Sequence, residues 1–277
     1  MASVRQLLRA ADALSGDSPR RDAEILLCHC LDKPRSWLYT WPEAEVGQAG
    51  ADNYRQLLAR RAEGVPIAYL TGRREFWSLQ LQVNEHTLIP RPETETLVEW
   101  ALELELTADA QVLDLGTGSG AIALALASER EQWQVTAVDN SLEALAIAAA
   151  NAGRIGLGRV SFVESNWFSA LGGRRFHLLL SNPPYVDAGD DHLQQGDLRF
   201  EPRGALVAAD GGLADLSRLV AEAPGYLMPG GWLLLEHGLE QGAQVRQLLQ
   251  TQGFQAIATR RDMADRERIT GGCWHAQ

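Results

Sequence analysis

The chain has 277 residues, of which 45% are hydrophobic and 22% are charged. This globular composition excludes extended disorder, and the length is more than one typical core needs and less than three domains would use. No run of eighteen apolar residues is present, which excludes a transmembrane helix. The N-terminal residues lead into an amphipathic stretch without the apolar core of a signal peptide, so we expect a cytoplasmic protein.

The formal net charge of −11 is distributed unevenly along the chain. Residues 1–89 carry 11 basic and 11 acidic side chains, whereas residues 90–277 carry 14 basic and 25 acidic ones. An acidic surface repels a phosphate backbone at long range, so the charge weighs against a nucleic-acid partner without excluding a local basic groove. The three cysteines, Cys28, Cys30 and Cys273, show neither a CxxC nor a Cys/His metal spacing, and we predict no metal site.

Helical periodicity dominates the start of the chain. Residues 4–14 are amphipathic, a second helix is expected to begin at Pro19 after Ser18, and a third covers residues 51–62. The pattern changes after residue 72. Alternating apolar residues at 74–83 predict a short β-hairpin, and the two prolines within residues 88–92 indicate a rigid extended connector.

From residue 110 onward, strand and helix patterns alternate. Strands are expected at residues 111–115, 135–138, 160–163, 177–180 and 232–236, with a closing strand pair at 254–259 and 268–274. Helices are expected at residues 121–129, 142–151, 214–226 and 241–252. This succession predicts an open α/β sheet that binds ligands at the C-terminal ends of its strands.

The first predicted strand of this sheet ends in a glycine-rich loop, Gly116-Thr117-Gly118-Ser119-Gly120. Glycines permit a tight turn and bring a ligand close to bare backbone, although tight packing alone is an alternative reason for them. The dinucleotide fingerprint is G-x-G-x-x-G, and here the third glycine comes one residue early.

Two acids flank the glycine loop. Asp114 stands before it, where a carboxylate would oppose a pyrophosphate and suit a cation, and S-adenosylmethionine carries a sulfonium and an ammonium. Asp139 ends the next strand, at the position from which a carboxylate accepts both ribose hydroxyls. A nucleotide-like ligand is therefore predicted.

The tetrapeptide Asn182-Pro183-Pro184-Tyr185 follows the fourth predicted strand. The two prolines offer carbonyl acceptors without N–H donors on a stiff backbone, and the Asn182 side chain adds another carbonyl. Such acceptors can hold both hydrogens of a planar NH₂ group, favour a pyramidal nitrogen and stabilise the positive charge that develops on it. Tyr185 adds an aromatic wall. The alternative is a rigid turn that only packs Tyr185 into the core.

The segment from Asp114 to Gly120 and the Asn182–Tyr185 motif together resemble class I S-adenosylmethionine-dependent methyltransferases that act on planar amino or amide nitrogen. Further stretches narrow the resemblance to the bacterial peptide-chain release factor glutamine methyltransferases, the PrmC or HemK family. These stretches are residues 70–72, 75–77, 88–95, 199–202, 205–206, 260–262 and 266–269. The resemblance covers nearly the whole chain, and the two core motifs show no departure from the family pattern.

This resemblance implies a Rossmann-like fold in residues 91–277, with a seven-stranded, mostly parallel sheet and an antiparallel closing strand. Before it lie a helical bundle, residues 1–72, that docks the release factor, and a β-hairpin linker, residues 73–90. The implied reaction is N5-methylation of the glutamine in the Gly-Gly-Gln motif of release factors one and two. S-adenosyl-L-methionine is the implied methyl donor, S-adenosyl-L-homocysteine the by-product, and no metal takes part.

The resemblance also implies roles for individual residues. The glycine loop holds the methionine part of the cofactor, Asp139 binds ribose and Trp167 lies beside adenine. The residues implied in cofactor binding are Asp114, Gly116, Thr117, Gly118, Ser119, Gly120, Asp139, Trp167 and Asn182. Asn182, Pro183 and Tyr185 are implied in catalysis, and the same three with Pro184 in substrate binding.

Several alternatives stay open. Arg91 either meets the methionine carboxylate or pairs with Glu93 or Glu95, Trp167 either walls the adenine or packs into the core, and Glu236 is either structural or close to the cofactor. A nucleic-acid amino-methyltransferase, acting on adenine N6 or guanine N2, suits the same tetrapeptide, as does a ribosomal-protein glutamine methyltransferase. The acidic charge counts against the first of these enzymes. We expect a monomer that binds release factors and contacts neither nucleic acid nor membrane.

Overall fold

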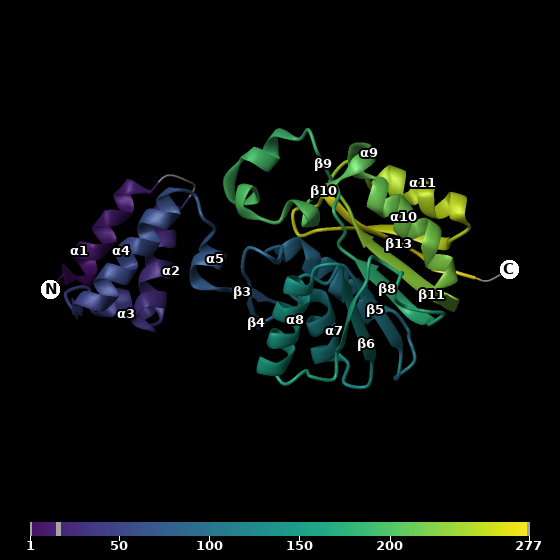
Figure 1. Cartoon of the computed structure of the whole chain (residues 1–277), viewed down its shortest axis with the longest axis horizontal. Helices are drawn as coiled ribbons and strands as arrows, with labels where there is room; N and C mark the ends of the chain where they lie inside the picture. Colours follow the sequence, from purple (N-terminus) through teal and green to yellow (C-terminus); the bar gives the residue numbers. More distant parts are fainter. Residues whose placement is uncertain (1, 15–17, 276–277) are drawn as a thin grey trace. The chain divides into compact units, whose positions relative to one another are not determined.

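The computed structural model describes residues 2–14 and 18–275. The chain divides into two compact units, one of Met1–Arg73 with Gln194–Phe200 and the other of Arg74–Leu193 with Glu201–Gln277. The helices and strands of both are labelled in Figure 1. Within the described ranges, no helix has the length and apolar character needed to cross a membrane.

The first unit is a bundle of short helices. They are α1 (Val4–Leu8), the 3-10 helix η1 (Arg9–Ala13), α2 (Pro19–Leu31), α3 (Arg35–Thr40), α4 (Gln48–Ala62), α5 (Ile67–Thr71) and the 3-10 helix η4 (Gly196–Phe200). A two-residue antiparallel pair joins β1 (Ala2–Ser3) to β2 (Glu45–Val46). The helix expected over residues 4–14 is α-helical only to Leu8 and continues as 3-10 helix, whereas α2 begins at Pro19 as predicted.

The core of the bundle shows why these helices associate. Leu26 and Leu27 of α2 and Tyr54 of α4 are fully buried, so two amphipathic faces meet there. The Tyr54 hydroxyl donates to the Leu7 carbonyl at 3.3 Å and is thereby satisfied inside the core. Glu24 is also fully buried, and its carboxylate accepts hydrogen bonds from three side chains, those of Arg20, Arg35 and Tyr39.

The predicted hairpin is present as β3 (Arg73–Phe76) and β4 (Leu79–Gln82). Its turn is made by Trp77 and Ser78, both with positive φ, 52° and 59°. The Trp77 backbone N–H donates to Glu95 Oε1 at 2.9 Å, which holds the turn against the following helix.

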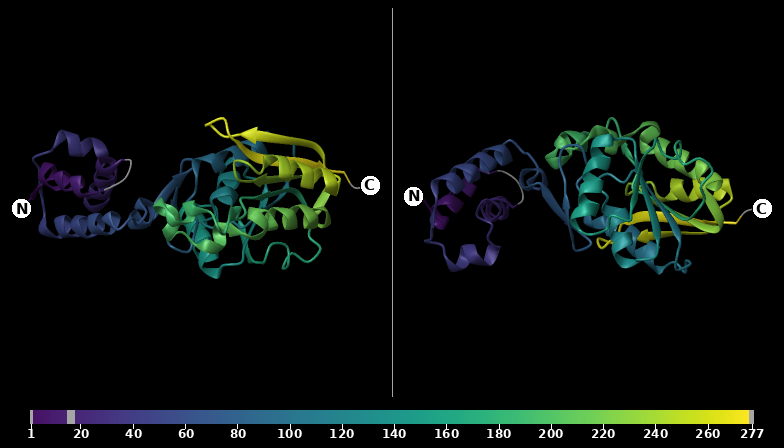
Figure 2. Two further views of the ribbon diagram at one scale, coloured as in Figure 1. Left: turned by 90° about the horizontal axis from the view of Figure 1, so that it is seen from above. Right: turned by 60° about the horizontal axis from the view of Figure 1, so that its bottom comes forward.

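The second unit is built on a seven-stranded sheet with the strand order β12-β13-β11-β8-β5-β6-β7. The strands are β5 (Gln111–Leu115), β6 (Gln134–Asp139), β7 (Ser161–Glu164), β8 (Phe176–Ser181), β11 (Leu227–Glu236), β12 (Gln255–Arg261) and β13 (Glu267–Trp274). Neighbours from β11 to β7 are parallel, and β13 is antiparallel to both β11 and β12. The yellow β12–β13 hairpin forms one edge of the sheet (Figure 2). This is the sheet that the sequence resemblance implies.

Side chains that alternate along each strand feed two separate cores. Val112, Leu178 and Leu234 face a cluster with α6 (Glu95–Glu103), α7 (Ala121–Glu129) and α8 (Leu142–Arg154). Their neighbours in sequence face the cluster formed with α10 (Ala214–Glu222) and α11 (Gly242–Gln252). Helices therefore cover both faces of the sheet, with α7 and α8 on one side and α10 and α11 on the other (Figure 1).

Several elements differ from the sequence-based expectation. Helix α6, with buried Leu97, Val98 and Trp100, was absent from it. The helix expected at residues 214–226 ends at Glu222. The short 3-10 helix η6 (Ala223–Gly225) follows it and contains Pro224, which cannot supply a backbone donor. The remaining short elements of this unit are η2 (Pro92–Thr94), η3 (Asp191–Gln194), η5 (Arg203–Ala205), α9 (Ala209–Gly212) and the parallel pair β9 (Val186–Asp187) and β10 (Val207–Ala208).

Candidate active site

The glycine loop links β5 to α7 and has a backbone that only glycine adopts easily. Gly116, Gly118 and Gly120 have φ values of 76°, 54° and 86°. A Cβ atom on Gly116 would lie 3.3 Å from the ring of Trp167, and one on Gly120 would lie 3.0 Å from Leu124. The loop is therefore both left-handed in conformation and closely packed, and it exposes backbone at Gly116 and Gly118 to a pocket.

Asp139, at the end of β6, holds this loop in place. Its Oδ2 atom accepts the Gly118 N–H at 2.8 Å, and Oδ1 accepts the Ser141 N–H at 3.0 Å. The carboxylate still lines the pocket, and each oxygen has a further lone pair for a ligand hydroxyl. Asp139 thus offers acceptor positions to the pocket as well as holding the loop.

Asp114 lies beneath the loop, fully buried and outside the pocket lining. Its Oδ2 atom accepts from Thr117 Oγ1 at 2.6 Å and from the Ala123 N–H at 3.2 Å. Burial raises the pKa of this carboxyl to about 7, although the two hydrogen bonds oppose the shift. Oδ1 is the one buried side-chain oxygen or nitrogen without a partner in the described part of the chain. A donor group of a ligand that reached it would relieve this unsatisfied acceptor.

Trp167 follows β7 and has an unusual backbone for a bulky residue, with φ of 53°. Its ring lies against Gly116, its indole N–H donates to Asp215 Oδ1 at 3.1 Å, and its carbonyl accepts from Ser165 Oγ at 2.7 Å. The side chain is half-buried and lines the same pocket as Asp139. It therefore combines core packing on one side with a wall for a planar ligand on the other.

The Asn182–Tyr185 motif begins where β8 ends. Asn182 and Pro184 line the pocket, whereas Pro183 is buried and Tyr185 points away toward the sheet. The Asn182 side-chain NH₂ donates to Thr94 Oγ1 at 3.2 Å, and no hydrogen bond to its carbonyl oxygen is found among the described residues. That carbonyl is consequently available to a ligand.

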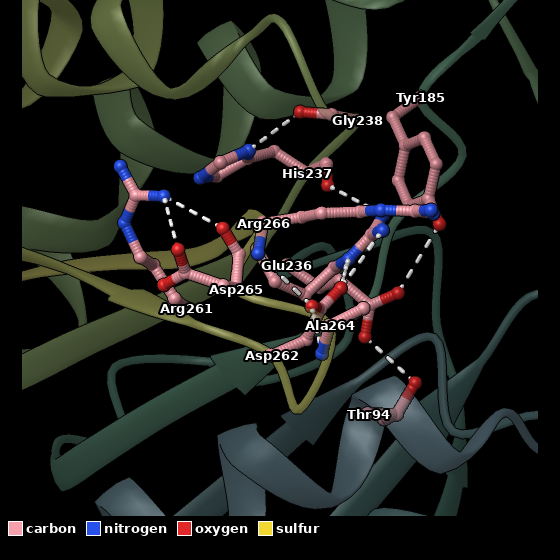
Figure 3. A network of polar contacts seen from close by, with 11 residues as sticks. Thr94, Tyr185, Glu236, His237, Gly238, Arg261, Asp262, Ala264, Asp265 and Arg266 are labelled. Carbon is pink, nitrogen blue, oxygen red and sulfur yellow. Dashed lines mark hydrogen bonds and ion pairs between the residues drawn. The ribbon is translucent and has the colours of Figure 1, made fainter.

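Thr94, the hydrogen-bond partner of Asn182, belongs to a buried polar network (Figure 3). Thr94 Oγ1 donates to Glu236 Oε2 at 2.7 Å, and the Tyr185 hydroxyl donates to Glu236 Oε1 at 3.1 Å. Glu236 is 1% exposed, and burial raises its pKa to about 7. Burial likewise raises the pKa of the Tyr185 hydroxyl. Glu236 does not line the pocket, so its contacts are with protein groups.

The turn between β12 and β13 is fixed by Asp262. Its Oδ1 atom accepts from the Ala264 and Arg266 amides at 2.9 and 3.1 Å, and its Oδ2 atom pairs with Arg268 Nη2 at 3.2 Å. Burial tends to raise the Asp262 pKa, but these amides and the guanidinium hold it below its usual value. Arg268 also donates to the His237 carbonyl at 3.3 Å, next to Glu236 (Figure 3). The stretches at residues 260–262 and 266–269 therefore stabilise the β12–β13 turn and connect it to the residue that follows β11.

Arg91 does not make the ion pair with Glu93 or Glu95 that was one of the two alternatives for it. It pairs instead with the buried Glu201, which precedes η5. Glu201 Oε2 also accepts the Ile89 N–H at 3.0 Å. This pair anchors the segment that carries three pocket-lining residues, Pro202, Gly204 and Ala205.

The pocket, of about 230 Å³, brings together only part of the predicted site. Of the predicted residues it is lined by Gly116, Gly118, Asp139, Trp167, Asn182 and Pro184. Asp114, Thr117, Ser119, Gly120, Pro183 and Tyr185 lie behind these residues. Lining residues that sequence reasoning did not single out include Glu85, His86, Asn140, Ser141, Ala144 and Asn166. No group of three His, Cys, Asp or Glu side chains arranged for a metal ion is present in the described residues.

Two solved structures with a similar fold are methyltransferases. A methyltransferase from Pyrococcus furiosus is 19% identical, with a TM-score of 0.55, covering 80% of this chain and 98% of that one. The catalytic domain of hMettl16, solved with an RNA hairpin, is 15% identical, with a TM-score of 0.59 and 82% of both chains covered. Residues 94–208 match the family model described as the methyltransferase small domain. The chain is an α/β methyltransferase of this class.

More specific matches extend to the helical unit. Residues 2–72 match the family model described as the PrmC N-terminal domain. A release factor glutamine methyltransferase of Pseudomonas aeruginosa is 52% identical over 99% of both chains. The enzyme of that name from Shewanella oneidensis is 52% identical over 95% of this chain and 92% of its own. The chain belongs to the release factor glutamine methyltransferase family.

Proposed function

We propose that the protein methylates the side-chain amide nitrogen of the glutamine in the Gly-Gly-Gln motif of peptide-chain release factors one and two. S-adenosyl-L-methionine is the proposed methyl donor and S-adenosyl-L-homocysteine the product. The observation that carries the proposal is one pocket lined by the glycine loop, Asp139 and the free carbonyl of Asn182. The relatives named for this activity support the choice of acceptor.

The pocket residues fit the proposed donor. Asp139 offers a carboxylate to the ribose hydroxyls, Trp167 offers an indole face to adenine, and the backbone of Gly116 and Gly118 is open to the methionine part. The unpartnered Oδ1 atom of Asp114 is an acceptor that a cationic or N–H group of the ligand would satisfy. The donor supplies an electrophilic methyl group. The residues that line the pocket include no lysine or arginine that would bind a phosphate.

Asn182 and the Pro183 carbonyl are proposed to hold the acceptor amide. No backbone or side-chain donor to the Pro183 carbonyl is found in the described ranges, so this oxygen and that of Asn182 both lack a protein donor. Two hydrogen bonds from the acceptor NH₂ group to these oxygens aim the nitrogen lone pair at the methyl carbon and stabilise the charge that develops on nitrogen. The N–C bond forms as the S–C bond breaks, and the methylated amide then releases its proton to solvent. No strong base is needed before transfer.

We assign docking of the release factor to the helical bundle, residues 1–72, with residues 73–90 as the linker and residues 91–277 as the catalytic region. Release factors work on ribosomes, so the reaction would take place in the cytoplasm. We also propose that the protein acts as a monomer.

The test supplies tritiated S-adenosylmethionine and the purified protein with one acceptor at a time: release factor, ribosomal protein or DNA. Label is expected in release factor alone. The matched control is a release factor whose motif glutamine is replaced by asparagine, which should stay unlabelled. Label in DNA or ribosomal protein and none in release factor would overturn the proposal in favour of the corresponding rival activity.

A further inference from the structure

The proposed reaction requires one particular end of the Asn182 amide to face the pocket. The carbonyl end accepts from a substrate NH₂ group, whereas the NH₂ end would meet it donor to donor. The two ends have nearly the same shape, so packing alone does not choose between them. A hydrogen-bond partner behind Asn182 has to make that choice.

Thr94 is that partner. Its hydroxyl oxygen lies 3.2 Å from Asn182 Nδ2 and 2.7 Å from Glu236 Oε2. Thr94 is 4% exposed and Glu236 is 1% exposed, so water does not compete for these bonds. The threonine comes from the end of η2, Asn182 from the end of β8 and Glu236 from the end of β11, and the fold brings them together.

The hydroxyl has one proton, and the other contacts decide where it goes. The Tyr185 hydroxyl already donates to Glu236 Oε1, and in the ionised state of Glu236 the carboxylate has no proton to donate to Thr94. Thr94 therefore donates its proton to Glu236 Oε2 and is left with lone pairs facing Asn182. Only the NH₂ end of Asn182 can bond to them, which turns the Asn182 carbonyl toward the pocket.

We propose that Thr94 is a positioning residue that, together with the Glu236 carboxylate, fixes the orientation of the Asn182 amide for substrate binding. The proposal rests on the function proposed above and adds to it a determinant outside the Asn182–Tyr185 motif. It also gives a role to the 88–95 stretch, in which Thr94 lies, and to Glu236, which closes the fifth strand. Arg268 from β13 and Glu93 from η2 are the charged groups that act on Glu236 beside Thr94 and Tyr185.

Three variants test the role of the hydroxyl. Thr94→Val keeps the shape and removes the hydroxyl, and we expect kcat to fall about 10- to 100-fold. The KM for release factor and the affinity for S-adenosylhomocysteine, measured by calorimetry, should change less than about twofold. Thr94→Ser restores the hydroxyl and should recover most of the activity. Thr96→Val removes a hydroxyl from the buried Thr96 of α6, outside this network, and serves as the matched control.

Glu236→Gln tests the direction of the bond. A protonated Glu236 can donate a hydrogen bond to Thr94 and reverse the direction of the hydrogen bonds that link Glu236, Thr94 and Asn182. The kcat of the wild-type enzyme should therefore rise with pH through about 7, the pKa of Glu236. The Glu236→Gln variant should have a low kcat that does not rise with pH in this range. A Thr94→Val enzyme with wild-type kcat, or equal losses in Thr94→Val and Thr96→Val, would overturn the proposal.

A measurement made without a methyl acceptor separates this proposal from the proposed function. The Asn182 side-chain amide protons, assigned in ¹⁵N spectra against Asn182→Ala, should exchange slowly with solvent in the wild type and in Thr94→Ser. They should exchange rapidly in Thr94→Val. A wild-type enzyme that leaves release factor unlabelled refutes the proposed function, whereas rapid exchange in the wild type refutes the positioning role of Thr94.

Discussion

Glu24 of the helical unit and two acids of the sheet unit, Asp114 and Glu236, are all fully buried, and their surroundings affect them in opposite ways. Glu24 in the helical unit is fully buried but bonded to two arginines and a tyrosine. Burial alone would raise its pKa, yet these partners hold the pKa below the usual value. Asp114 and Glu236 in the sheet unit have no cation in hydrogen-bond contact, and burial raises the pKa of each to about 7.

This difference separates acids that stabilise from acids that serve a site. The Glu24 cluster neutralises its charge within the bundle, so the acid ties α2 to α3. Asp114 and Glu236 of the sheet unit are instead buried near the candidate pocket without a hydrogen-bonded cationic partner, at a cost to their ionised state. Disturbing the first kind should change stability, and disturbing the second kind should change chemistry or pH dependence.

The largest expected effect is on chemistry at the edge of the sheet. Asn182→Ala removes an acceptor for the substrate amide and should lower methyl transfer by about 10²–10³-fold or more. Affinity for S-adenosylhomocysteine and the melting temperature should be nearly unchanged. Transfer by radiolabel, calorimetry and thermal unfolding measure the three quantities. A comparable loss of cofactor affinity would show that Asn182 belongs to the donor side instead.

The next effect concerns the pH dependence of stability. The pKa of Asp114 is raised from 3.8 to about 7, so its contribution to folding is complete below pH 4 and is lost as the pH rises through 7. A shift of about three units corresponds to about 4 kcal/mol. The free energy of unfolding, from urea titrations between pH 5 and 8, should fall with pH, and Asp114→Asn should flatten this slope. An unchanged slope in Asp114→Asn would contradict the assignment.

Glu24 should behave with the opposite sign. Its lowered pKa means that its contribution is present above pH 4.5 and is lost in acid. Glu24→Gln removes a buried charge-assisted cluster and should destabilise the protein by about 1–3 kcal/mol in urea unfolding at neutral pH. Arg20→Gln is the matched control, because Arg20 is 74% exposed and should contribute under about 1 kcal/mol. Equal losses in the two variants would mean that burial of Glu24 is not what matters.

The smallest effect concerns charge at long range. Residues 90–277 carry the whole net charge of −11, whereas residues 1–89 are neutral. If basic patches on release factors meet this acidic region, the association rate should fall several-fold as salt rises from about 50 to 500 mM. Stopped-flow mixing at several salt concentrations measures it. An association rate that does not change with salt would mean that the acidic region takes no part in docking and that only the neutral helical bundle does.

Features that depend on neighbours in sequence were predictable. The glycine loop, Asp139 and the Asn182–Tyr185 motif each follow a strand whose apolar pattern is clear, and parallel strands bring their ends to one edge. The seven-stranded sheet and family membership were likewise expected and are confirmed.

Pairings between distant residues were not predictable. Thr94 and Glu236 are 142 positions apart, and Arg91 and Glu201 are 110 apart, so no local pattern links them. Of the two alternatives for Arg91, pairing with Glu93 or Glu95 was wrong, because sequence proximity suggested these acids and gave no sign of the distant, buried Glu201. The burial of Asp114 was also missed, since a motif gives residue order but not which side chains turn inward.

The Ser181 hydroxyl donates a hydrogen bond of 2.6 Å to the Leu115 carbonyl and ties β8 to its neighbour β5 where both strands end. Most residues assigned to the methyl donor follow β5, β6 and β7, whereas those assigned to the acceptor follow β8. The two parts of the sheet are thus assigned to the two substrates of the proposed reaction, one to the methyl donor and the other to the acceptor. We therefore expect substitutions in the loop after β8 to act mainly on the acceptor, and those in the loops after β5, β6 and β7 to act mainly on the methyl donor.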